Sequence, residues 1–221
     1  KKDLGFVDPY CFFLKLSEKI KRNSLIFIDT GCSIAWAMQY MSFGEGKKVF
    51  HDFNNTAMGW ALPAAIGAYF ASDYKEVVCI VGDGSLMMSL QELATVMHHK
   101  IKIKLIIINN NGYSMIKQTQ EQWLNSNYVA SSNSGGISFP NYKKLSSTFN
   151  LDYFLIKNLE NDEHNLNSFF KNEKASLLEV LISEDARVVP QVKFGRPNED
   201  MEPLLPRDVF YENMIVKPIE N

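Results

Sequence analysis

Two short polar segments of this chain carry side chains that could bind a divalent cation and a phosphate group. One is Gly82-Asp83-Gly84-Ser85, and the other is Asn109-Asn110-Asn111-Gly112. Carboxylate and amide oxygens are ligands that Mg²⁺ and Ca²⁺ accept, and a glycine-rich turn lets backbone N–H groups approach an anion. Asp83 and Asn110 are therefore predicted to hold one divalent cation beside a diphosphate.

Each polar segment follows an apolar run that is typical of a buried strand, residues 77–81 for the first and 104–108 for the second. Between the two runs, residues 86–98 have the periodicity of a helix. A strand–helix–strand crossover brings the carboxyl ends of both strands to one edge of the sheet, where open α/β sheets bind ligands. Either segment alone is common loop sequence, whereas their paired placement favours a binding site.

The rest of the chain predicts a doubly wound, mostly parallel α/β fold with helices on both faces of the sheet. One domain is expected over residues 1–189, followed by an extended tail at 190–221 that holds five of the eight prolines and packs on the domain or on a partner. Residues 125–140, rich in Ser, Asn and Gly, are expected to be a loop that covers the site. The further elements predicted are helices at 10–20, 35–41, 56–71, 113–123, 142–149 and 160–172 and strands at 25–28, 49–50, 153–156 and 177–182.

Composition excludes several classes of partner. The net charge is −2 over 221 residues, so there is no electrostatic basis for binding nucleic acid or an anionic membrane surface. No apolar run approaches the roughly 20 residues that a membrane span needs. The three cysteines show no C-x-x-C spacing, which predicts a reduced, cytoplasmic protein. Lys100, Lys102 and Lys104 alternate and are expected on a solvated edge.

The two polar segments also resemble a known family. Gly82-Asp83-Gly84 followed by Asn109-Asn110 is similar to the cofactor signature of thiamine diphosphate enzymes. Residues 56–68 and 91–95, with Met115-Ile116-Lys117-Gln118, resemble the acetolactate synthase branch of that family. The part that matches is the C-terminal, diphosphate-binding domain of a three-domain enzyme. The resemblance implies thiamine diphosphate and Mg²⁺ as cofactors.

Carried over by position, the resemblance implies a metal site and a diphosphate site. The metal would be bound by the side-chain oxygens of Asp83 and Asn110 and by the backbone carbonyl of Gly112. The residues implied to contact the diphosphate are Gly82, Gly84, Ser85 and, from the opposite side, Gly31, Cys32 and Ser33. For residues 31–33 a simple turn after a strand explains the sequence equally well.

The resemblance also assigns residues to the rest of the cofactor. Met58 would support the bent cofactor from below, and the Thr56 carbonyl would accept a hydrogen bond from its aminopyrimidine; filling of the core is the alternative for Met58. Tyr113, Ser114 and Met115 would flank the diphosphate and the mouth of the site.

The implied activity is decarboxylation or carboligation of a small-molecule 2-oxo acid by a lyase or transferase. No catalytic residue is expected in this chain, because the activating Glu of the family lies on a pyrimidine-binding domain or subunit. The chain is therefore predicted to be inactive alone and to work in a homo-oligomer, a dimer or tetramer. The apolar helix at 56–71 is a candidate interface, or a buried core helix.

The family pattern is not followed everywhere. Branched-chain synthases carry Gln-Trp-Gln where this chain has Gln118-Thr119-Gln120, so an acceptor other than 2-oxobutyrate, polar or larger, is predicted. Two alternatives to the synthase remain. One is the β-type subunit of a split 2-oxo acid decarboxylase, of the sulfopyruvate or phosphonopyruvate type, and the other is a non-catalytic assembly domain.

Overall fold

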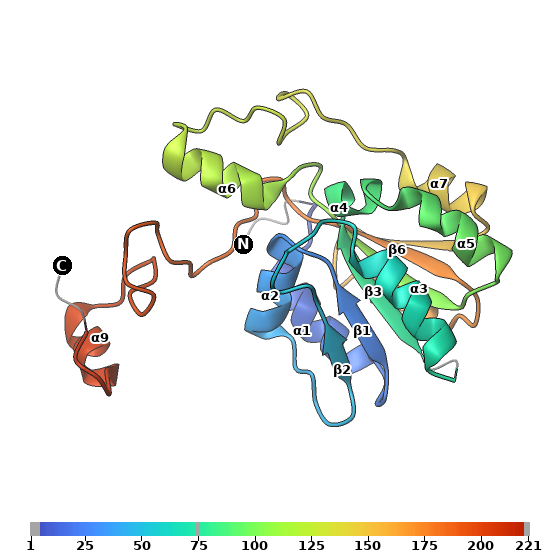
Figure 1. Ribbon diagram of the computed structural model, residues 1–221, viewed down its shortest axis with the longest axis horizontal. Coiled ribbons are helices and arrows are strands. Elements are labelled where there is room, and N and C mark those ends of the chain that lie inside the picture. The colour runs from blue at the N-terminus through green and yellow to red at the C-terminus, as the bar shows by residue number, and fades with distance from the viewer. Residues whose placement is uncertain (1–4, 74–75, 219–221) are drawn as a thin grey trace.

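A six-stranded sheet, with every strand parallel to its neighbours, forms the centre of the computed structural model, which describes residues 5–73 and 76–218 (Figure 1). The strand order is β2-β1-β3-β4-β6-β5. The chain therefore leaves β1 in one direction and later returns to the other side of it, which creates a crevice between the carboxyl ends of β1 and β3. The strands are β1 (Leu25–Ile28), β2 (Lys48–Phe50), β3 (Val77–Gly82), β4 (Ile103–Asn109), β5 (Asp152–Ile156) and β6 (Ser176–Leu181).

Helices cover both faces of the sheet, and this confirms the predicted fold class. Alternate strand residues enter two separate cores: Ile26 and Ile28 face one, whereas Leu25 and Phe27 face the other. On the first face lie α1 (Pro9–Lys19), α2 (Cys32–Tyr40) and α8 (Glu163–Lys171); on the second lie α3 (Ala61–Ala71), α5 (Leu93–His98) and α7 (Tyr142–Thr148). Within the described ranges, no helix has the length and apolar character that crossing a membrane requires.

Two predicted helices differ from the structure in ways that matter for the site. The helix predicted from residue 56 begins only at Ala61, because Thr56 (φ 50°) and Gly59 (φ 83°) have left-handed backbone conformations that interrupt a helix. The helix predicted at 86–98 is three pieces: α4 (Asp83–Met87), a 3₁₀ turn (Leu90–Glu92) and α5. Asp83 is therefore the first residue of a helix, directly after β3.

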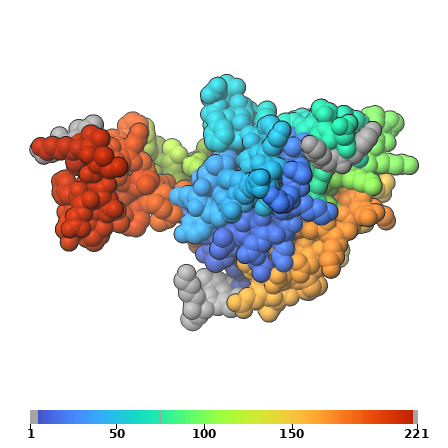
Figure 2. All heavy atoms as spheres, turned by 90° about the horizontal axis from the view of Figure 1, so that it is seen from below, coloured from blue at the N-terminus to red at the C-terminus, as the bar shows by residue number. Residues whose placement is uncertain are grey.

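Helix α6 (Ser114–Trp123) and the C-terminal tail lie to one side of the sheet (Figure 1). The tail was predicted to be extended, but part of it is helical, because Arg207–Asn213 forms helix α9. Figure 2 shows the last part of the tail as a lobe set apart from the body. The rings of Trp123 on α6 and Phe194 on the tail lie 4.4 Å apart, so the two segments touch.

The prediction that Lys104 lies on a solvated edge is wrong. Lys104 is 4% exposed on the central strand β4, and its Nζ donates to the carbonyl of Asn172. Burial lowers the pKa of Lys104 to about 8. A long aliphatic stem allows Lys to cross an apolar layer and place its charge at the far end.

Candidate functional site

A pocket of about 270 Å³ opens at the carboxyl ends of β1, β3 and β4. Four stretches of chain form its walls: the turn after β1, the loop before α3, the turn from β3 into α4, and the turn from β4 into α6. Every residue that the sequence predicted for the site lies in its lining: Gly31, Cys32, Ser33, Thr56, Met58, Gly82, Asp83, Gly84, Ser85, Asn110, Gly112, Tyr113, Ser114 and Met115. The parallel sheet brings them together, because consecutive strands end at the same edge.

Asp83 is a buried carboxylate at the base of the pocket, 2% exposed. Its Oδ1 accepts a hydrogen bond from the Gly84 N–H at 2.7 Å, and its Oδ2 accepts one from the Gly112 N–H at 3.1 Å. The two strand-end turns are thus joined through this side chain. Burial raises the pKa of Asp83 to about 7, although these backbone hydrogen bonds oppose the rise. Among the described residues no Lys or Arg forms an ion pair with it.

Asn110 lies beside Asp83 in the wall and is also buried. Its Nδ2 donates to the Ser114 Oγ, so its amide nitrogen has a partner within the protein. An amide whose nitrogen is held in this way presents its oxygen as the free acceptor. One carboxylate, one amide oxygen and a nearby backbone carbonyl are a donor set suited to a hard divalent cation.

Two glycines are required by close packing around the pocket. A Cβ on Gly84 would lie 2.0 Å from the Tyr113 ring, and a Cβ on Gly112 would lie 2.8 Å from the Ser131 carbonyl oxygen. The Tyr113 ring therefore lies directly on the β3–α4 turn. A side chain at Gly84 would displace the Tyr113 ring from the β3–α4 turn, and one at Gly112 would press on the Ser131 backbone. Either change would disturb a glycine whose N–H donates to Asp83.

The loop before α3 forms another wall. Met58 is 40% exposed and lines the pocket, which contradicts the alternative that it fills the core. The Cys32 thiol on α2 is buried and donates to the Gln118 Oε1 at 3.7 Å. Burial raises the pKa of Cys32 to about 12, so the thiol is neutral near pH 7.

Sequence reasoning missed several residues at this site. The lining also includes Thr30, Trp36, Ile108 and Ile116. Just outside it, Asp29 is a fully buried carboxylate that follows β1. The rule that singled out Asp83, a polar residue directly after a buried strand, applies equally to Asp29 and would have found it.

Other predicted features lie away from the pocket. Thr119 lies on the exposed side of α6, where its Oγ1 donates to the Met115 carbonyl, and it is absent from the lining. The loop at 125–140 packs on α6, with the Gln120 side chain bonded to Val129 and Ser131. It supplies no described residue to the pocket wall. No group of three His, Cys, Asp or Glu side chains that could hold a metal occurs in the part of the chain that the structure describes.

Comparisons with known proteins agree with this site. A family model described as "Thiamine pyrophosphate enzyme, C-terminal TPP binding domain" matches residues 29–180. The acetolactate synthase large subunit of Porphyra purpurea is 31% identical over 188 residues, which cover 85% of this chain and 31% of that protein. The acetolactate synthase isozyme 1 large subunit of Escherichia coli (strain K12) is 29% identical over 179 residues, 81% of this chain and 31% of that one.

A solved structure shares the fold. The thiamine diphosphate-dependent 4-hydroxybenzoylformate decarboxylase of Rhodococcus jostii RHA1 matches with a TM-score of 0.70 and 20% identity. The match covers 82% of this chain and 33% of that chain. At this identity the likeness concerns the fold alone. The chain spans about a third of the length of these relatives.

Proposed function

The chain belongs to the thiamine pyrophosphate enzyme family through a C-terminal TPP-binding domain at residues 29–180, and on this premise we propose that its pocket binds thiamine diphosphate together with Mg²⁺. One observation carries the proposal: the residues that match the family's cofactor positions come from four separate stretches of chain and line a single pocket.

The pocket residues fit the metal and the diphosphate. Asp83 is a buried carboxylate without an ion-pair partner in the described chain, and a bound cation would compensate its burial. In the proposed site Asp83, Asn110 and the Gly112 carbonyl bind Mg²⁺. Gly82, Gly84 and Ser85 bind the diphosphate, with Gly31, Cys32 and Ser33 closing it from the other side.

The remaining lining residues fit the rest of the cofactor. Met58 supports its rings from the loop before α3, and the Thr56 carbonyl accepts a hydrogen bond from the aminopyrimidine. Tyr113, Ser114 and Met115 border the mouth. When bound, thiamine diphosphate supplies the carbon nucleophile for a 2-oxo acid; the protein's part is to bind, orient and exclude water.

We further propose that the active enzyme acts on a small 2-oxo acid, as an acetolactate synthase-like carboligase or decarboxylase. Its activating Glu would come from a pyrimidine-binding domain or subunit, and the enzyme would be a homo-oligomer. Helix α6 supports this proposal, because it buries polar residues and exposes Met115 and Ile116 at the pocket and Trp123 at its far end. An apolar face that points outward is typical of an interface.

The helix at 56–71, by contrast, is a poor candidate for that interface. Ala61, Leu62, Ala65 and Ile66 of α3 are buried in the core of this chain. The proposed contact with a pyrimidine-binding partner therefore lies on α6.

Titration calorimetry of the chain with thiamine diphosphate and Mg²⁺ tests the cofactor proposal. We expect metal-dependent binding, and we expect Asp83→Asn to weaken it by about 100-fold, or roughly 2.7 kcal/mol, because a charged ligand is lost. Asp52→Asn is the matched control, since among the described residues the Asp52 side chain bonds within its own turn, to Asn55.

The absence of any Mg²⁺-dependent heat for the unaltered chain would contradict the proposal and leave the non-catalytic assembly domain as the better interpretation. Equal binding by the Asp83→Asn chain would contradict the metal assignment alone.

A further inference from the structure

The end of β1 carries a buried carboxylate that has no place in the pocket lining. Asp29 is 0% exposed. Its Oδ1 accepts hydrogen bonds from the N–H groups of Thr30 at 2.9 Å and Gly59 at 3.0 Å, and its Oδ2 accepts one from the Ala61 N–H at 2.8 Å. Amide donors to an ionised acceptor in the interior form strong hydrogen bonds.

The three amides belong to two stretches of chain that form pocket walls, the turn after β1 and the loop that leads into α3. Thr30 begins the wall formed by the turn after β1, and Gly59 directly follows Met58. Ala61 is the first residue of α3, and the preceding Trp60 provides no side-chain cap. Asp29 therefore caps α3 from a neighbouring strand, in the place where the helix dipole favours negative charge.

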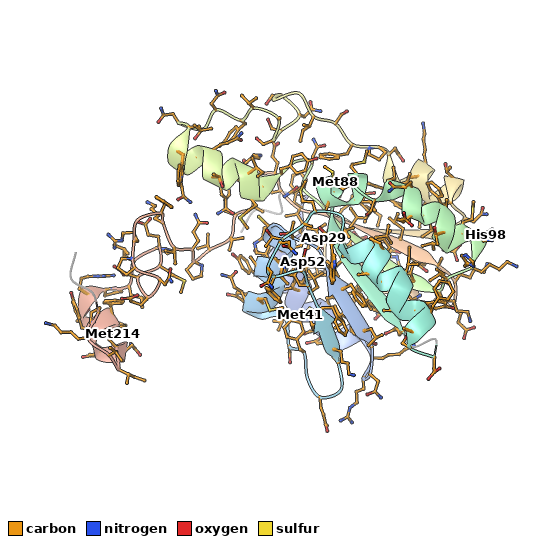
Figure 3. All side chains as sticks on the ribbon, viewed as in Figure 1. Asp29, Met41, Asp52, Met88, His98 and Met214 are labelled. Atoms are coloured by element: carbon orange, nitrogen blue, oxygen red, sulfur yellow. The ribbon has the colours of Figure 1, made fainter. Side chains whose placement is uncertain are left out.

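Gly59 is held from its other side as well. Its φ is +83°, and a Cβ there would lie 2.6 Å from the Met88 Cβ and 3.3 Å from the Ser85 carbonyl oxygen. Figure 3 shows Asp29 at the carboxyl end of the sheet with Met88 above it. The backbone of Gly59 thus lies between the Asp29 carboxylate and the end of α4. At this junction, three walls of the pocket meet.

We infer that Asp29 is a positioning residue, which fixes Met58 relative to the β3–α4 turn by holding the Gly59 and Ala61 amides. Asp29 does not itself line the pocket, so its effect on a ligand passes through the loop that carries Met58. The inference rests on the proposed function, because Met58 has a ligand to support only if the pocket binds the thiamine cofactor.

Two ligands separate positioning from general support of the fold. Thiamine diphosphate with Mg²⁺ uses both the diphosphate subsite and the Met58 wall, whereas inorganic pyrophosphate with Mg²⁺ uses the first alone. Asp29→Asn keeps the shape but leaves one acceptor oxygen for three donors. We expect the variant of the 221-residue chain to bind thiamine diphosphate about tenfold more weakly and pyrophosphate within about twofold of the unaltered chain.

Asp52→Asn is the control for this substitution, because the same change at the start of the same loop should alter neither affinity. An equal loss for both ligands, or a loss for neither, would overturn the inference. Failure of the proposed function has a different signature: the unaltered chain would then bind neither ligand.

A second variant covers the case in which Asp29→Asn does not fold, as judged by circular dichroism. Gly59→Ala displaces the same loop by contact with Met88. It should also weaken the binding of thiamine diphosphate more than the binding of pyrophosphate. Its control is Gly67→Ala, where an added Cβ meets no atom within 4 Å. If Gly59→Ala also unfolds the chain, the junction serves the fold alone and the inference is wrong.

Discussion

Helices α3 and α6 both follow loops that line the pocket, but they are attached to the molecule in opposite ways. Helix α3 buries apolar side chains, among them Leu62 and Ile66, against the sheet. Helix α6 buries Ser114, Lys117, Gln118 and Gln120 and turns its apolar residues outward.

The polar side of α6 is held by the segment that follows β6. Lys117 Nζ donates to the Glu184 carbonyl at 2.9 Å, and Gln118 Oε1 accepts from the Val188 N–H at 3.0 Å. Arg187 binds the Glu121 carboxylate through two of its nitrogens. Such hydrogen bonds fix the orientation of α6, but they stabilise its attachment less than burial of apolar side chains does. The comparison shows that α3 packs its apolar residues within this chain, whereas α6 turns an apolar face outward, which supports the proposed contact with another surface there.

The largest expected effect contrasts a buried apolar residue on α3 with an exposed one on α6. Leu62→Ala on α3 should lower the free energy of unfolding by about 2–5 kcal/mol, because it leaves a cavity in the core. Ile116→Ala on α6, where the side chain is 48% exposed, should change it by less than about 0.5 kcal/mol. Urea unfolding of both variants measures the difference. Similar losses would show that the two helices are attached alike.

The second prediction concerns Lys104, a charged residue buried on β4 against Phe169 of α8. The pKa of Lys104 is lowered by burial from 10.5 to about 8. Between these values the unfolded chain binds more protons than the folded one, so stability should rise with pH from about 8 to 10.5. Allowing for solvent screening, the free energy of unfolding should rise over this pH range by about 1–2 kcal/mol more than it does in Lys104→Met.

Unfolding measured at several pH values tests this prediction, with Lys102→Met as the control because Lys102 is exposed. The free energies of unfolding of the unaltered chain and of Lys104→Met are compared at each pH. If their difference does not vary over this pH range, Lys104 keeps its ordinary pKa.

The smallest expected effect is local to α6. The hydrogen bond from Arg187 lowers the pKa of Glu121, so the ion pair contributes above the ordinary pKa of 4.5 and its contribution is lost as pH falls through the lowered value. Glu121→Gln at neutral pH should cost about 1 kcal/mol. Hydrogen exchange should speed up in α6 but not in α3. Faster exchange in both helices would contradict the separation of the two regions.

The strands and the pocket were accessible from sequence because both depend on local pattern. Apolar runs define β1, β3 and β4, and parallel pairing then forces the residues after them, Asp83 and Asn110, to one edge. The start of α3 was not accessible in this way: Thr56 and Gly59 adopt left-handed conformations that tertiary contacts impose. Strand periodicity alone also could not reveal that Lys104 is buried. Its alternation with Lys100 and Lys102 predicts a solvent-facing position, whereas its long apolar stem lets the residue lie within the core.

Helix α6 shows a second limit. Its sequence is amphipathic, and the rule that apolar faces point inward predicts the wrong orientation for a helix whose polar residues contact a polar segment. The orientation becomes predictable only when residues 184–191, which lie far along the chain, are known to pass beneath it.

The three tryptophans lie in three different settings, and this gives the molecule built-in optical reporters. Trp36 is fully buried in the pocket lining, Trp60 is half-buried at the Asp29–Gly59 junction, and Trp123 is 55% exposed at the end of α6. A collisional quencher dissolved in water therefore reaches Trp123 first and Trp36 last. Emission that becomes shielded from the quencher on mixing with another protein would report, without any label, that the outer face of α6 has been covered.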